Sequence, residues 1–127
     1  MEWNFRNDLP IYSQLVEQIK LAIVSGVFAP GMRLSSVRDM AAEAGVNPNT
    51  LQRALQELER QGLVYSQRTA GRFVTEDSTV IANVKKAFAE EQIQGFLEAM
   101  SKRGYDRREI ISLLEEKEEE TNADLGV

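Results

Sequence analysis

Apolar side chains recur at helical spacing in residues 36–45, and the same kind of pattern returns in residues 47–62. In the second segment they fall at i, i+3, i+4 and i+7, the stripe by which an amphipathic helix packs on a core. Gly45 and Gly62 follow the last apolar positions, where a residue in left-handed conformation commonly ends a helix. The pattern therefore predicts a short helix, a tight turn and a longer helix, which is the spacing of a helix-turn-helix.

The residues that begin these two helices support the assignment. Asn47 is a favoured N-cap, and Pro48 falls at the first helical position, where its missing N–H costs nothing. Ser36 and Asp39 have the spacing of a capping box, with Asp in the place where Glu is more usual. We expect each cap side chain to accept a hydrogen bond from a backbone N–H of its own first turn.

The face of the second helix opposite the apolar stripe is rich in amide and guanidinium groups. Asn49 and Arg53 lie roughly opposite the stripe, and Thr50 and Gln52 flank it. Such side chains can hydrogen-bond base edges or phosphates. For an isolated helix a plain solvated face is the simpler interpretation, but the second helix of a helix-turn-helix is the one that enters the DNA major groove.

A β-hairpin is predicted directly after the second helix. Residues 63–66 and 72–75 are short apolar strand candidates, and residues 67–71 form a tip that contains a glycine. A hairpin in this place is a wing, and its side chains Arg68, Thr69 and Arg72 are suited to contacts with the DNA backbone or minor groove. An ordinary exposed hairpin is the alternative.

The remaining chain is predicted to be mainly helical. Residues 10–25 form an amphipathic helix that packs beneath the helix-turn-helix, and residues 1–5 alternate as a short strand would. The fold class is mainly α with a small β-hairpin wing, divided into a winged helix-turn-helix domain (residues 1–77) and a helical segment (residues 78–127). Asp106 and Glu109 form a second capping-type pair within that segment.

Two helices in fifty residues cannot enclose much core by themselves, yet the segment carries many large apolar side chains. Association with the same segment of a second subunit would cover them, and packing back on the chain's own winged helix is the alternative. The residues predicted to form the dimer contact are Val84, Phe88, Phe96, Leu97, Met100, Ile110 and Leu114.

Charge and composition restrict the function further. The net charge is −5, but residues 31–72 carry six basic and four acidic side chains, a local positive strip that fits salt-sensitive DNA binding better than a general nucleic-acid coat. The chain has no histidine and no cysteine, so the commonest general base and the usual zinc ligands are missing. We therefore expect no enzyme, no cofactor and no metal site.

No apolar run approaches a membrane span and no signal peptide is evident, which leads us to expect a cytoplasmic protein.

Residues 10–75 resemble the winged-helix domain of the GntR family of bacterial transcription regulators. The resemblance is specific because many landmarks occur in order and at the right spacing. They are Pro10-Ile11-Tyr12, Gly26, Pro30-Gly31, Arg33-Leu34, Ser36-Val37-Arg38, Gly45-Val46, Asn49-Thr50, Gly62-Leu63 and Gly71. Two positions depart from the family pattern: Ser35 stands where Pro is usual, and Gln52 stands where Arg is often found.

The resemblance implies a set of DNA contacts that includes the side chains selected above. They are Arg38, Asn47, Asn49, Thr50, Gln52 and Arg53 in the helix-turn-helix, and Arg68, Thr69 and Arg72 in the wing. The short helical tail is similar to that of the YtrA-like subfamily. This implies that the tail forms a homodimer and that the regulated genes are an operon encoding an ABC transporter.

The sequence thus predicts a sequence-specific DNA-binding regulator, a homodimeric repressor that occludes a palindromic operator. Its partners would be double-stranded DNA and a second copy of itself. The alternative function is a winged-helix protein–protein interaction module that does not read DNA. The operator, the regulated genes and any small-molecule effector are not specified by the sequence.

Overall fold

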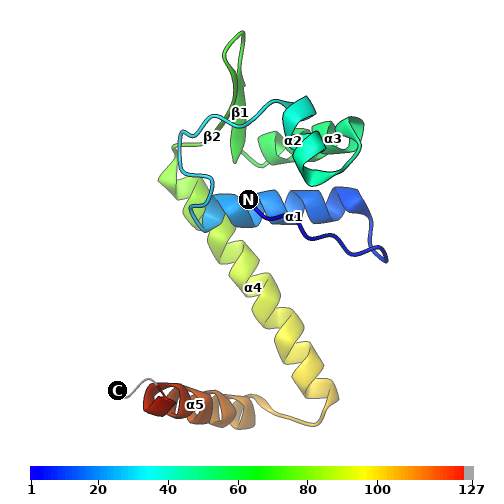
Figure 1. Ribbon diagram of the computed structural model, residues 1–127. Helices are drawn as coiled ribbons and strands as arrows, with labels where there is room; N and C mark the ends of the chain where they lie inside the picture. Colours follow the sequence, from blue (N-terminus) through cyan, green and yellow to red (C-terminus); the bar gives the residue numbers. More distant parts are fainter. Residues whose placement is uncertain (125–127) are drawn as a thin grey trace. The chain divides into compact units, whose positions relative to one another are not determined.

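The computed structural model describes residues 1–124 and is shown in Figure 1. Its elements are α1 (Ile11–Val24), α2 (Val37–Ala44), α3 (Pro48–Arg60), β1 (Val64–Gln67), β2 (Gly71–Val74), α4 (Ser78–Lys102) and α5 (Arg107–Asp124). The chain divides into two compact units, Met1–Lys85 and the residues from Lys86 onward. The first unit has the predicted winged helix-turn-helix architecture, and the boundary between the units lies within α4. The last three residues of the predicted C-terminal segment lie outside the described part of the chain.

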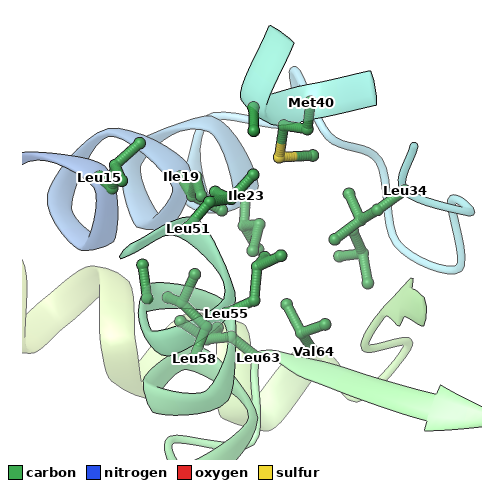
Figure 2. Close-up of a cluster of buried hydrophobic side chains, with 13 residues drawn as sticks. Leu15, Ile19, Ile23, Leu34, Met40, Leu51, Leu55, Leu58, Leu63 and Val64 are labelled. Atoms are coloured by element: carbon green, nitrogen blue, oxygen red, sulfur yellow. The ribbon is translucent and has the colours of Figure 1, made fainter. Parts of the chain in front are cut away.

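The core of the first unit lies between α1 and α3. Figure 2 shows the leucine and isoleucine side chains of the two helices directed toward one another, with Met40 of α2 closing one side. Leu15 and Ile19 of α1 and Leu51 and Leu58 of α3 have no solvent exposure. These are the positions of the predicted apolar stripes, so the stripes pack as the periodicity indicates.

The wing is an antiparallel hairpin in which Val64 pairs with Val74 and Gln67 pairs with Gly71. A segment before α2, which the strand prediction did not include, also joins this sheet. Leu34 N donates to Arg72 O at 2.9 Å and Val74 N donates to Met32 O at 2.9 Å, and Arg33 forms an isolated bridge with Phe73. The hairpin is therefore joined by hydrogen bonds to the chain that leads into α2.

The prediction of a strand at residues 1–5 was wrong. No strand pairs with this segment, and a glutamine of α1 takes that place: Gln18 Nε2 donates to Asn4 O at 2.6 Å and Gln18 Oε1 accepts from Asn4 N at 3.3 Å. The apolar alternation was nevertheless meaningful, because Trp3 and Phe5 pack against the core and stack on each other. An extended segment becomes a strand only where a neighbouring strand supplies a hydrogen-bonding partner.

The start of α4 belongs to the first unit. Val80, Ile81 and Val84 are partly buried against the winged-helix core, so Val84, a predicted dimer residue, already has an apolar contact within its own chain. Asp77 Oδ1 accepts from Thr79 N at 2.9 Å and caps the helix.

In the second unit the predicted dimer residues differ in exposure. Phe88, Leu97 and Met100 are half-buried, and Ile110 is 5% exposed, whereas Phe96 is 44% and Leu114 is 55% exposed. The predicted cap of α5 is present as a reciprocal pair of hydrogen bonds, because Glu109 N donates to Asp106 Oδ1 at 2.8 Å and Asp106 N donates to Glu109 Oε1 at 3.2 Å.

Candidate DNA-binding surface

The turn between α2 and α3 is held by local hydrogen bonds that orient the start of α3. Gly45 adopts a left-handed conformation (φ 72°), and Val46 N donates to Ala41 O at 3.0 Å. Asn47 Oδ1 then accepts from Asn49 N at 2.8 Å, as the cap prediction required. Ser36 Oγ likewise accepts from Asp39 N at 3.1 Å at the start of α2.

The first two turns of α3 present the predicted polar side chains. Asn49 and Arg53 are exposed, and Thr50 and Gln52 are half-buried at the edges of the face. The guanidinium of Arg53 lies over the ring of Tyr12 in α1, with its Cζ 4.8 Å from the ring centroid, a cation–π arrangement. Sequence reasoning gave Tyr12 no role, because nothing in its local pattern indicates which helix it will face.

The far end of α3 is occupied by charge pairs within the chain. Hydrogen bonds from Arg60 and Gln61 lower the pKa of Glu57 to about 2, and the Arg60 charge adds to the effect. The same contact raises the pKa of Arg60. Arg60 is therefore paired with a carboxylate of its own helix, which agrees with its omission from the predicted DNA contacts.

The tip of the wing exposes Arg68 and Thr69. Thr69 has a positive φ of 69°, a conformation that is uncommon outside glycine, asparagine and aspartate, and Ala70 N closes the turn by donating to Gln67 O at 3.1 Å. Both predicted tip residues are thus available to an external partner, and neither has a side-chain hydrogen bond in the described chain.

Arg72, the third predicted wing residue, faces the protein. Its Nε donates to Glu59 Oε1 of α3 at 2.6 Å, and Ser66 Oγ donates to the same oxygen at 2.5 Å. The Arg72 side chain is only 17% exposed. Partial burial alone would raise the pKa of Glu59, but the hydrogen bonds from Ser66 and Arg72 lower it below its ordinary value. Glu59 was not identified from the sequence, since no local signal shows that a helical Glu will meet a wing Arg.

The wing and the start of α2 enclose a cleft of about 390 Å³. Its lining includes two arginines and four hydroxyl side chains, and no acidic residue. They are Arg33, Arg72, Ser35, Ser36, Ser66 and Thr69. Arg38 follows directly after the cleft residue Val37, in the first turn of α2, and is exposed. The predicted wing residues Thr69 and Arg72 therefore line a cleft together with the residues that lead into α2.

Comparison with known proteins identifies this architecture. The family model for bacterial regulatory proteins of the gntR family matches residues 11–74. The chain belongs to the GntR family. This GntR protein is 36% identical over 111 residues to the uncharacterized HTH-type transcriptional regulator YhcF of Bacillus subtilis, covering 87% of this chain and 92% of YhcF. It is 36% identical over 90 residues to the HTH-type transcriptional repressor YtrA of the same organism, covering 70% and 69%.

Solved structures agree with the sequence relatives. A GntR family transcriptional regulator from Listeria monocytogenes superposes with a TM-score of 0.83 at 37% identity, covering 88% of this chain and 98% of that one. The DNA-binding domain of AraR, solved in complex with operator ORX1, matches with a TM-score of 0.54 at 30% identity, over 59% and 96%. This GntR protein is accordingly a DNA-binding transcriptional regulator with a winged helix-turn-helix.

Within residues 1–124, none of the helices combines the length and the apolar character that a membrane crossing requires.

Proposed function

We propose that this GntR-family regulator is a homodimeric repressor that binds a palindromic operator. The proposal is based mainly on the start of α3. There the Asn47 cap orients a polar surface, and residues of the wing line a cleft with the chain that leads into α2. In helix-turn-helix docking the first turns of the second helix meet base edges in the major groove. The exposed Asn49 and Arg53 and the flanking Gln52 occupy those turns.

Base reading and backbone anchoring are assigned to different elements. Asn49, Gln52 and Arg53 would contact bases, because amide and guanidinium groups form the bidentate pairs that distinguish them. Thr50 and Asn47 lie beside them at the helix start. Arg38, at the start of α2, and the wing side chains Arg68 and Thr69 would contact phosphates, which position the protein without specifying a sequence.

Dimer formation is supported by apolar surface that the described chain leaves uncovered. Phe96 and Leu114 are about half exposed, and so are their neighbours Ile93 and Ile111 (57% and 49%). Contiguous exposed apolar side chains mark interaction sites in proteins of this size. A second copy of the same segment would cover them, and the resulting two-fold symmetry would be mirrored in a palindromic operator.

The repressor role rests on the relatives, since YtrA of B. subtilis carries that description. The mechanism would be occlusion of a promoter by the bound dimer. The resemblance to YtrA-like regulators is the basis for proposing an operon that encodes an ABC transporter as the target, and a cytoplasmic location follows from action on the chromosome. Footprinting on the protein's own promoter tests the target directly.

The test of DNA reading compares two arginine variants on duplexes selected from a random library and on scrambled duplexes. Arg53→Ala should cost about 1–3 kcal/mol on the selected duplex and relax the preference at one base pair. Arg38→Ala should weaken both duplexes equally and make the slope of log affinity against log salt shallower by about one unit per subunit. The reverse result would exchange the two roles.

The test of assembly is the solution mass, which should be twice the 14.3 kDa of one chain. Phe96→Glu would bury a charge in the contact and should yield monomers with weaker operator binding, because the second half-site loses its tethered partner. Asn83→Glu introduces the same charge at an exposed position of α4 and should leave the dimer intact. A wild-type chain that stays monomeric at micromolar concentration and on DNA would contradict the dimer.

The alternative is a winged-helix protein–protein interaction module. It predicts that the wild-type chain binds selected and scrambled duplexes equally weakly, with no dependence on salt. This result would remove the repressor proposal regardless of the oligomeric state.

A further inference from the structure

The arginines of the first unit fall into two groups according to their partners. Four of the seven are engaged within the chain: Arg6 with Asp8, Arg53 with Tyr12, Arg60 with Glu57 and Arg72 with Glu59. The other three have no ion pair and no ring contact with the side chains of residues 1–119. They are Arg33, Arg38 and Arg68. The three unpaired guanidinium groups have no partner within the described chain that would compete with an external anion, and the ring contact of Arg53 leaves its N–H donors free as well.

One of the three unpaired arginines lines the cleft between the wing and the start of α2, and the other two are adjacent in the sequence to lining residues. Arg33 lines it directly, Arg38 follows the lining residue Val37, and Arg68 stands between the lining residues Gln67 and Thr69. No acidic residue lines the cleft, and Arg72, its other lining arginine, is paired with Glu59. The cleft thus has an excess of positive charge that the described chain does not balance.

Arg33 is held in this cleft by the backbone. Its neighbours Met32 and Leu34 are hydrogen-bonded to β2, and Arg33 itself forms an isolated bridge with Phe73, so its backbone is fixed against the wing. Its guanidinium passes over Gly71: a Cβ on that glycine would be 3.1 Å from Arg33 Nε and 3.5 Å from Nη2. A hydrogen atom at residue 71 leaves room for the guanidinium against the wing backbone.

We propose that this cleft holds a backbone phosphate of DNA and that Arg33 is the cation that binds it, an anchoring contact beyond those implied by the family resemblance. Arg, Ser, Thr and backbone groups are the usual partners of DNA phosphates, and the cleft lining has this chemistry without a carboxylate. The inference rests on the proposed DNA-binding function. It adds a phosphate contact to those proposed for α2 and for the wing tip.

The test measures the affinity of the full-length protein for selected and scrambled duplexes at several salt concentrations. Arg33→Gln should weaken both duplexes by the same factor and make the slope of log affinity against log salt shallower by about 0.9 per subunit. Arg33→Lys keeps the charge and should retain the wild-type slope. Arg6→Gln removes the same charge outside the cleft, next to Asp8, and should also retain it.

Three outcomes would overturn the proposal. An unchanged slope in a folded Arg33→Gln variant would exclude the phosphate contact, while selective binding by the wild type would show that the DNA-reading function still holds. A changed preference for the selected duplex would mean that Arg33 reads bases. Failure of the wild type to prefer any duplex would remove the function itself, and the slopes would then identify no contact.

A measurement on the wild-type protein covers the case in which Arg33→Gln does not fold. The ¹⁵N signal of Arg33 Nε should shift on titration with the scrambled duplex and should remain unchanged with inorganic phosphate at the same ionic strength. A matching shift with inorganic phosphate at millimolar concentration would assign the cleft to a free anion and overturn the DNA assignment.

Discussion

The contact between Arg72 and Glu59 leads to a prediction that separates two roles for a wing arginine. Arg72 was predicted to contact DNA, but its Nε lies 2.6 Å from Glu59 Oε1 and its side chain is 17% exposed. From this geometry we expect Arg72 to act mainly as an anchor that joins the wing to α3. The perturbations are Arg72→Gln, Glu59→Gln and the double variant.

The expected decrease in the free energy of unfolding follows from the groups that lose their hydrogen-bonding partner. Arg72→Gln leaves a carboxylate with the Ser66 hydroxyl alone, and hydrogen bonds to charged groups contribute about 1.5–3 kcal/mol. The Glu59 side chain is 30% exposed, and water therefore recovers part of this loss. We expect a decrease of about 1–2 kcal/mol in the free energy of unfolding, with a coupling of about 1 kcal/mol between the two positions.

The stability that the Glu59 carboxylate contributes should depend on pH in one direction. Because the pKa of Glu59 is lowered in the folded state, its carboxylate favours folding above the pKa of an unfolded glutamate. The stability difference between wild type and Glu59→Gln should therefore be full at pH 7 and should decline as the pH falls below about 4.5. Urea unfolding at a series of pH values measures it.

DNA titration of the same variants distinguishes anchor from contact. If Arg72 anchors the wing, Arg72→Gln and Glu59→Gln should weaken binding by similar factors without a change in the salt slope. If Arg72 contacts a phosphate directly, only Arg72→Gln should weaken binding, and the slope should become shallower by about 0.9 per subunit. The second pattern, or a coupling below about 0.5 kcal/mol in the double-mutant cycle, would refute the anchoring role.

Variants at three further positions test other contacts. Tyr12→Leu should reduce the preference for the selected duplex by about two- to fivefold through loss of the ring under Arg53, whereas Tyr12→Phe should retain it; duplex titration measures both. Asp106→Ala removes half of the reciprocal cap with Glu109 and should cost about 0.5–2 kcal/mol, seen as earlier loss of helical circular dichroism on heating. Leu55→Ala should lower the free energy of unfolding by about 2–5 kcal/mol in urea, because Leu55 is 1% exposed.

The helices and their ends could be predicted because their causes are local. The Asn47 and Ser36 caps each bond a backbone N–H two or three residues away, and Gly45 adopts the left-handed conformation that its place after α2 indicated. The apolar stripes reached the core because helical periodicity alone decides which side chains share a face. Local signals of this kind also made the family recognisable from residues 10–75.

Contacts between distant segments required the tertiary structure. Arg72 and Glu59 are 13 residues apart, and Tyr12 and Arg53 are 41 apart, so no local pattern reveals that they meet. The same holds for Arg33, whose bridge with Phe73 joins segments that α2 and α3 separate in the sequence. Residues 1–5 were predicted as a strand from a local pattern that is present. They form no strand because no neighbouring strand pairs with them, and the Gln18 side chain supplies the hydrogen bonds instead.

The sequence alone therefore determined which side chains could contact DNA, because residue type and position on a helix or turn are local properties. The tertiary structure decided which of them are free to do so. Arg72 is paired with Glu59 of α3, whereas Arg38 and Arg68 make no ion pair with the side chains that the structure describes. A guanidinium binds the carboxylate that the fold brings within hydrogen-bonding distance, and only the folded chain specifies which carboxylates those are.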